Sequence, residues 1–214
     1  MSELNNKKIR IRFEKTGLAK YISHLDLNRL FSRSLARAGI EVAHSEGFNP
    51  RPKIVFSSAI SLGMESLIEF TDIKITDDKS PEQIFDEIKR VFPDGVNILD
   101  VYEPQNDFKN IDNTRFHIYI KPNGLFVDEL IKLFDGDIFS EKKSGTIINL
   151  KNYICGLIIS EELSGYILID AVLKTNQEMY LNPENIIKSI DINSVEDYYI
   201  KKIEIYDKDN NIFR

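Results

Sequence analysis

Two histidines that lie close together in the sequence, His24 and His44, are the first residues that could do chemistry. Histidine titrates near neutral pH, so a converging pair can serve as general base and general acid, for example in metal-independent cleavage of an RNA backbone. Ser23 precedes His24, but adjacent residues rarely face each other, which disfavours a nucleophile and base. The alternative is that a histidine at a helix start makes only local hydrogen bonds.

Basic residues are concentrated in the same part of the chain. Between Lys7 and Lys53 there are 11 basic and 4 acidic residues, so this segment carries +7 in a chain of net charge −6. Arg29, Arg33 and Arg37 stand four residues apart and would stack on one face of a helix. This ridge is a candidate track for phosphate groups. Alternatively, the arginines pair with the protein's own carboxylates.

The segment SEGFNPRPK, residues 45–53, predicts a stiff loop after that helix. Gly47 permits a positive φ, and the two prolines restrict themselves and the residues before them. Such a loop can hold side chains ready to bind a nucleic acid or an acidic partner. Its candidate binding residues are Ser45, Phe48, Asn49, Arg51 and Lys53. The alternative is a rigid connection with Phe48 packed in the core.

The elements around these residues follow a β-α-β-β-α-β order. A helix from about His24 to Ala38, with Ser23 as its N-cap and Gly39 as its end, carries the three arginines. Alternating apolar and polar residues predict a strand before it. The other predicted elements are the strands KIVFSSAI, SLIEFTDIKI and GVNILDVY and the helix SPEQIFDEIKRVF. This order is typical of a ferredoxin-like unit.

The second half of the sequence repeats the plan. Its predicted elements are RFHIYIK, GTIINL, GYILIDAVL and YYIKKIEIY as strands, and GLFVDELIKLF and NPENIIKSI as helices. Residues 151–163 predict either a short helix or an extra strand. The sequence therefore predicts an α+β protein of two tandem ferredoxin-like units with antiparallel sheets, residues 1–104 and 114–214, joined by a polar linker over 105–113.

Composition excludes several classes of function. Cys155 is the only cysteine, so the chain makes no internal disulfide and has no C-x-x-C motif. No glycine-rich phosphate-binding motif is present, and no histidine or acidic pair fits a strong metal template. We expect no bound metal and no cofactor. No apolar stretch reaches the roughly 20 residues of a membrane helix and no signal peptide is visible, so we expect a cytoplasmic protein without a membrane partner.

The N-terminal third resembles a known family. The stretch from Ile11 to Ile73 is similar to the start of the radical-SAM-linked proteins, an uncharacterised bacterial domain of unknown function found beside or fused to radical SAM proteins. The matching motifs are Arg12-Phe13, Tyr21-Ile22-Ser23-His24-Leu25-Asp26, Arg37-Ala38-Gly39, Ser45-Glu46-Gly47-Phe48-Asn49-Pro50 with Pro52, Leu62-Gly63 and Glu65-Ser66. The rest of the chain matches only in pattern and length.

The resemblance implies a partner rather than an activity. A separate radical SAM enzyme would be that partner, since one cysteine cannot hold an iron–sulfur cluster. We expect a non-catalytic accessory or substrate-recognition protein for this enzyme, with RNA as a candidate ligand of the basic N-terminal surface. Two alternatives stay open: a metal-independent ribonuclease that uses His24 and His44, and a purely structural interaction module.

Overall fold

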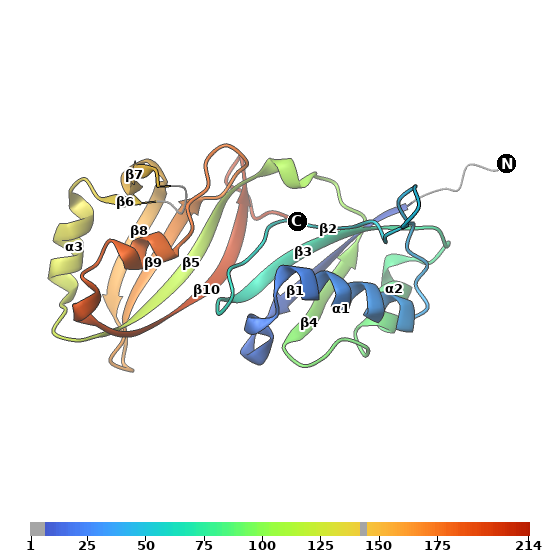
Figure 1. Ribbon diagram of the computed structural model, residues 1–214, viewed down its shortest axis with the longest axis horizontal. Helices are drawn as coiled ribbons and strands as arrows, with labels where there is room; N and C mark the ends of the chain where they lie inside the picture. Colours follow the sequence, from blue (N-terminus) through green and yellow to red (C-terminus); the bar gives the residue numbers. More distant parts are fainter. Residues whose placement is uncertain (1–6, 142–144) are drawn as a thin grey trace. The chain divides into compact units, whose positions relative to one another are not determined.

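The structure is a computed structural model that describes residues 7–141 and 145–214 (Figure 1). It divides into two compact units, one up to Asn106 together with Arg214 and the other Asp107–Phe213. The fold is mixed α+β, with mostly antiparallel strands and four α-helices in the described residues. The α+β class that the sequence predicts is thus confirmed.

The first unit is built on an antiparallel sheet in the order β4-β1-β3-β2. Its strands are β1 (Lys7–Lys15), β2 (Ile54–Phe56), β3 (Glu65–Ile75) and β4 (Val96–Tyr102). The predicted alternation in β1 is confirmed, because its apolar side chains are all fully buried. They are Ile9, Ile11 and Phe13.

Helix α1 (His24–Arg37) forms where its local signals predict. The Ser23 hydroxyl accepts a hydrogen bond from the Asp26 N–H at 3.1 Å, which satisfies one of the free donors at the helix start. Gly39 follows the helix with a φ of +70°, the left-handed conformation that glycine adopts without strain. Phe31 anchors the helix, since its ring lies 4.8 Å from that of Phe13 in the core.

Helix α2 (Pro81–Ile88) also begins as predicted and ends earlier than the predicted segment. Ser80 and Gln83 form a reciprocal capping box, and Pro81 occupies the first helical position. Ile84 and Ile88 are fully buried and join the same core cluster as the apolar face of α1. The first unit therefore has one continuous core that fixes both helices against its strands.

In the second unit, antiparallel strands pair in the order β10-β5-β9-β8. Its strands are β5 (Ile111–Pro122), β8 (Ile154–Glu161), β9 (Ile167–Lys174) and β10 (Val195–Asp207). A separate hairpin pairs β6 (Phe139–Glu141) with β7 (Ile147–Asn149). The second unit also contains α3 (Val127–Asp135), α4 (Glu184–Lys188) and the 3-10 turns η2 (Phe108–Asn110), η3 (Leu150–Asn152) and η4 (Ile192–Ser194), and the first unit contains the 3-10 turn η1 (Gly17–Tyr21).

The second half differs from the predicted plan in two places. The segment GTIINL does not join the main sheet but supplies β7 of the small hairpin, while residues 151–163 supply β8, the extra strand of the two alternatives, which pairs with β9. In addition, β5 begins at Ile111, inside the segment 105–113 that we expected to be a linker.

No helix among the described residues is both long and apolar enough to cross a membrane.

Candidate functional site

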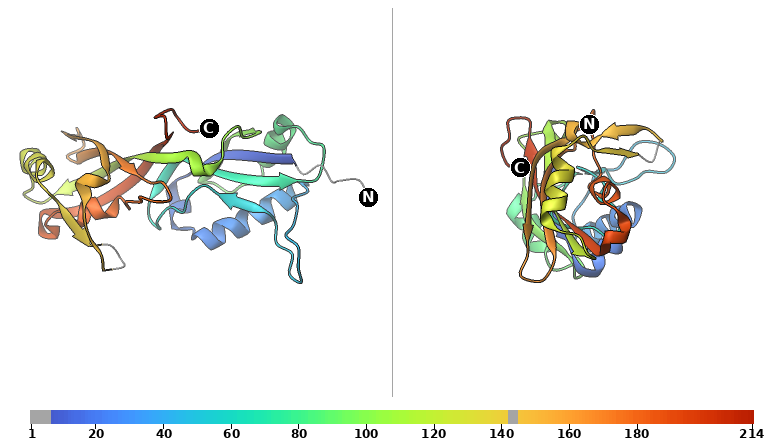
Figure 2. Two further views of the ribbon diagram at one scale, coloured as in Figure 1. Left: turned by 90° about the horizontal axis from the view of Figure 1, so that it is seen from above. Right: turned by 90° about the vertical axis from the view of Figure 1, so that its left-hand side faces the viewer.

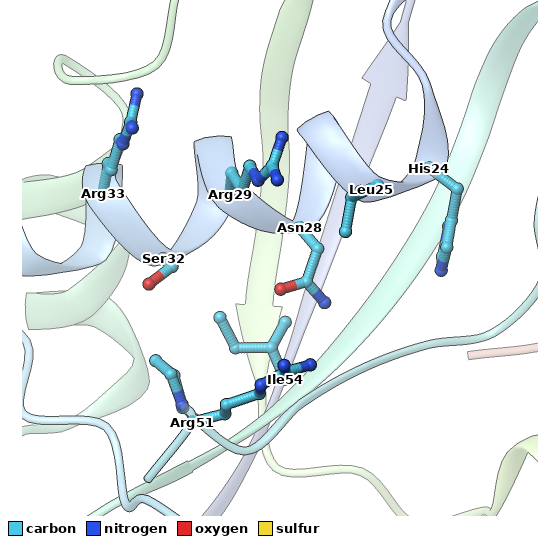
Figure 3. A pocket seen from close by; sticks show the side chains of 9 residues that line it. His24, Leu25, Asn28, Arg29, Ser32, Arg33, Arg51 and Ile54 are labelled. Carbon is cyan, nitrogen blue, oxygen red and sulfur yellow. The ribbon is translucent and has the colours of Figure 1, made fainter. Parts of the chain in front are cut away.

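A pocket of about 660 Å³ opens in the first unit between α1 and the chain that leads into β2 (Figure 3). Helix α1 contributes His24, Leu25, Asn28, Arg29, Ser32 and Arg33 to its lining. The opposite wall is made by Arg51, Pro52 and Ile54. The pocket therefore joins the two sequence features that could do chemistry, the arginine-bearing helix and the proline-rich loop.

The helical side of the pocket follows from simple periodicity. Leu25, Asn28, Arg29, Ser32 and Arg33 are spaced three and four apart, so they form one stripe along α1. In Figure 3 the side chains of Asn28 and Ser32 point from the helix toward Arg51. Neutral polar groups thus lie between the helical arginines and the arginine of the loop.

Arg37 does not belong to this site, although the sequence places it on the same ridge. Its guanidinium donates hydrogen bonds to the Ser34 hydroxyl at 3.2 Å and to the Val91 carbonyl at 2.9 Å. The bond to Val91 ties the end of α1 to the segment after α2. We therefore assign Arg37 to the fold and not to the pocket.

The pocket arginines differ in how they are paired. Arg29 forms an ion pair with Asp26 at 3.0 Å, and both side chains are more than half exposed. The Ser23 hydroxyl, together with Arg29, holds the pKa of Asp26 below its ordinary value. The side chains of Arg33 and Arg51 have no ion pair or hydrogen bond within the described part of the chain. Two guanidinium groups are therefore available to a ligand.

A hairpin-like loop positions Arg51. The Ser45 N–H donates to the Arg51 carbonyl at 2.8 Å, and the Arg51 N–H donates back to the Ser45 hydroxyl at 3.0 Å. His44 and Pro52, the neighbours of Ser45 and Arg51 on the side of the loop base, form an antiparallel bridge. Figure 2, left, shows the segment between α1 and β2 projecting from the unit. The backbone of Arg51 is thus fixed on both sides before any ligand binds.

The tip of the loop is exposed. Gly47 has a φ of +121°, and the Phe48 side chain has a relative exposure of 106%. The alternative in which Phe48 packs in the core is wrong. Asn49 is exposed beside it, and Lys53 is half-buried in the loop base outside the pocket lining. An aromatic ring held in water at the end of a stiff loop is available as a contact surface.

The two histidines occupy different places. His24 lines the pocket, and its ring makes an edge contact with Phe56, with 5.3 Å between the ring centroids. His44 lies at the base of the loop, where it forms the bridge with Pro52, and it is not among the residues that line the pocket. Only one of the two candidate acid–base residues therefore reaches the site.

Sequence reasoning missed the neutral half of the pocket. Asn28 and Ser32 have no side-chain hydrogen bond within the described residues, and both face the cavity. Their membership of the Arg29 and Arg33 stripe is the signal that could have identified them. Within the same residues no group of three or more His, Cys, Asp or Glu is placed to hold a metal ion.

The fold and the pocket define a mixed α+β protein with an arginine-lined cavity. A family described as uncharacterized proteins conserved in bacteria, DUF2344, matches residues 8–183, and the chain belongs to this family. No curated protein matches the sequence.

Two solved structures align with the chain only at low scores. An unknown protein from Galdieria sulphuraria aligns at a TM-score of 0.29 and 8% identity, covering 92% of this chain and 99% of that chain. A DyP-type peroxidase from Mycobacterium smegmatis aligns at a TM-score of 0.23 and 8% identity, covering 91% of each chain. At these scores neither structure bears on function.

Proposed function

We propose that this protein is a non-catalytic accessory subunit that binds RNA on behalf of a separate radical SAM enzyme. The observation that carries the RNA-binding part of the proposal is that Arg33 and Arg51 both line one pocket and have no ion pair within the described residues. Guanidinium groups are well suited to phosphate because their planar array of donors matches phosphate oxygens. Arg29 adds a third cation that is only weakly held by an exposed carboxylate.

The net charge of −6 restricts RNA binding to a local part of the surface. A protein that is acidic overall does not attract RNA through its whole surface, so binding depends on a local cluster of cations. Phe48 adds an exposed ring on which an unpaired base can stack. These features together favour a short, single-stranded region of RNA over a duplex.

The radical SAM half rests on the resemblance of the N-terminal third to radical-SAM-linked proteins. The motifs that carry this resemblance include Tyr21-Ile22-Ser23-His24-Leu25-Asp26 and SEGFNP. The first motif supplies His24 and Leu25 to the pocket lining, and the second is the part of the loop that leads to Arg51. We infer that the enzyme supplies the cluster chemistry while this chain supplies the binding site. We expect both proteins in the cytoplasm.

We also propose that each unit is ferredoxin-like. The strand orders β4-β1-β3-β2 and β10-β5-β9-β8, all antiparallel, support this assignment. The hairpin β6–β7 would then be an insertion in the second unit. Such folds host many functions, so the assignment adds nothing to the choice of ligand.

Salt-dependent binding of single-stranded RNA tests the first half of the proposal. Replacing both Arg33 and Arg51 with alanine should weaken binding about tenfold or more, because each phosphate contact is a charge-assisted hydrogen bond. The slope of log affinity against log salt should also fall by about 1.4. A matched control is the Arg90→Ala/Lys132→Ala double variant, which removes two exposed cations elsewhere. Equal losses in the two double variants would overturn the assignment to the pocket.

A pull-down from native lysate, with and without nuclease, tests the second half. We expect mass spectrometry to identify a radical SAM protein that remains bound after nuclease treatment. Recovery only without nuclease would mean that RNA bridges the two proteins and would overturn a direct partnership. Absence of any radical SAM protein from both samples would remove the accessory role.

A further inference from the structure

The pocket is larger and more varied than a phosphate alone requires. Its volume of about 660 Å³ lies in the range of small-molecule sites, roughly 300–1,000 Å³. A single phosphate or carboxylate would need the arginines but would leave most of this space unfilled. The lining therefore points to a ligand with a substantial uncharged part.

The lining also contains apolar residues, which we call the apolar wall. Leu25 from α1 and Pro52 and Ile54 from the loop side supply carbon surface without charge. Flat aromatic ligands pack favourably on such surfaces, since burial of apolar area is favourable and non-directional. A nucleobase has a face of this kind.

The neutral polar groups supply what a base edge needs. The Asn28 amide offers both a donor and an acceptor, and the Ser32 hydroxyl can serve as either. Neither side chain has a hydrogen bond within the described residues, so both can form hydrogen bonds with a ligand. A side-chain amide can contact two positions of a base edge at once, which discriminates between bases.

Duplex RNA cannot present a base to such a cavity. Paired bases have their edges engaged and stacked, and proteins read RNA sequence mainly on unpaired bases that can be turned outward. Arg33 and Arg51 both line the cavity, and Arg51 lies on the side toward which Asn28 and Ser32 point, where it can contact the phosphate next to an inserted base.

We propose that the pocket receives one unpaired ribonucleotide, with its base against the apolar residues and the side chains of Asn28 and Ser32 and its phosphate on Arg51. This inference rests on the proposed RNA binding and narrows it to base-selective capture of a single nucleotide. The fixed backbone of Arg51, bonded twice to Ser45, lowers the entropy lost on binding.

The test compares the four ribonucleoside 5′-monophosphates, their nucleosides, inorganic phosphate and a single-stranded RNA by titration calorimetry. We expect one monophosphate to bind about tenfold or more tightly than inorganic phosphate and to compete with the RNA. Asn28→Ala should reduce the preference among bases about fivefold or more, and Ser32→Ala should reduce it independently. Asn152→Ala, an exposed asparagine in η3 of the second unit, is the matched control and should leave the preference unchanged.

The outcomes separate this inference from the proposed function. RNA binding that depends on Arg33 and Arg51, without competition by any monophosphate, would overturn nucleotide capture and leave RNA binding standing. Equal binding of phosphate and all four monophosphates would overturn base selection. No binding of RNA or nucleotides by the folded wild-type protein would overturn both.

Discussion

Arg10 of β1 and the pocket residues Arg33 and Arg51 come from the same basic stretch of sequence but have opposite surroundings. Arg10 on β1 is fully buried, and its guanidinium donates to the two carboxylate oxygens of Asp72 at 2.7 and 3.0 Å. It also donates to the Asn106 carbonyl at 2.8 Å. Arg33 and Arg51 are exposed and have no ion pair or side-chain hydrogen bond within the described part of the chain.

The difference shows why a charge count does not locate a binding surface. A buried cation has to be paired, because an uncompensated charge in the interior costs several kcal/mol. Lys15 obeys the same rule, since it is 1% exposed and its ammonium donates to the Ile22 carbonyl. Part of the N-terminal excess of +7 is therefore internal, whereas Arg33 and Arg51 are exposed and can meet a ligand.

The strongest way to break this comparison is to remove the buried arginine. Arg10→Ala leaves Asp72 5% exposed with Lys8, at 2.9 Å, as its remaining ion-pair partner among the described residues. We expect a loss of about 3–5 kcal/mol in the free energy of unfolding, near the lower value because Lys8 stays. Urea denaturation followed by circular dichroism measures it.

The control for that experiment is Arg33→Ala, an exposed arginine in the middle of α1. We expect its free energy of unfolding to stay within about 0.5 kcal/mol of wild type, since surface substitutions without partners change stability little. If both variants lost similar stability, the distinction between structural and ligand-directed arginines would be wrong.

A smaller effect is expected at the start of α1, which positions the pocket. Ser23→Ala removes the side-chain acceptor of the Asp26 N–H, and loss of such a cap costs about 1 kcal/mol. Ser32→Ala is the matched control, because that hydroxyl has no partner within the described residues and alanine is the better helix former. Thermal denaturation should rank Ser23→Ala below wild type and Ser32→Ala close to it; the reverse order would contradict the capping role.

Elements with strong local signals could be predicted from the sequence. The alternation in β1, the Ser23 cap of α1 and the capping box of α2 each depend on residues within one turn or one strand. For the same reason the four-residue spacing of Arg29 and Arg33 is enough to predict that they share a stripe. Local signals fix an element, and they also fix which side chains share its face.

Features decided by distant residues could not be predicted in the same way. The runs GTIINL and 151–163 are both apolar, and pairing with β9 decides that the second one joins the sheet. Arg10 and Asp72 are separated by 62 residues, so nothing near Arg10 in the sequence distinguishes it from Arg33. Asn28 and Ser32 become pocket residues only because the loop with Arg51 lies opposite them.

The comparison can be sharpened by making Arg29 resemble Arg33. Asp26→Asn keeps the shape of the side chain but removes the carboxylate that pairs with Arg29 at 3.0 Å. Exposed pairs of this kind are weak, so we expect RNA affinity to rise by only about two- to fivefold at low salt. Fluorescence anisotropy at several salt concentrations measures the gain, which should shrink as salt increases.

The pH dependence and a matched control complete this last prediction. Ser23 and Arg29 lower the pKa of Asp26 from its ordinary 3.8, so the carboxylate stays charged as pH falls from 7 toward that ordinary value. Any contribution of Asp26 to stability is present above its unfolded pKa and is lost only as pH falls through the lowered folded pKa. The gain from Asp26→Asn should therefore be constant over that range. Asp86→Asn breaks a comparable exposed pair with Lys89 on α2, and an equal gain there would mean that net charge, not release of Arg29, sets the affinity.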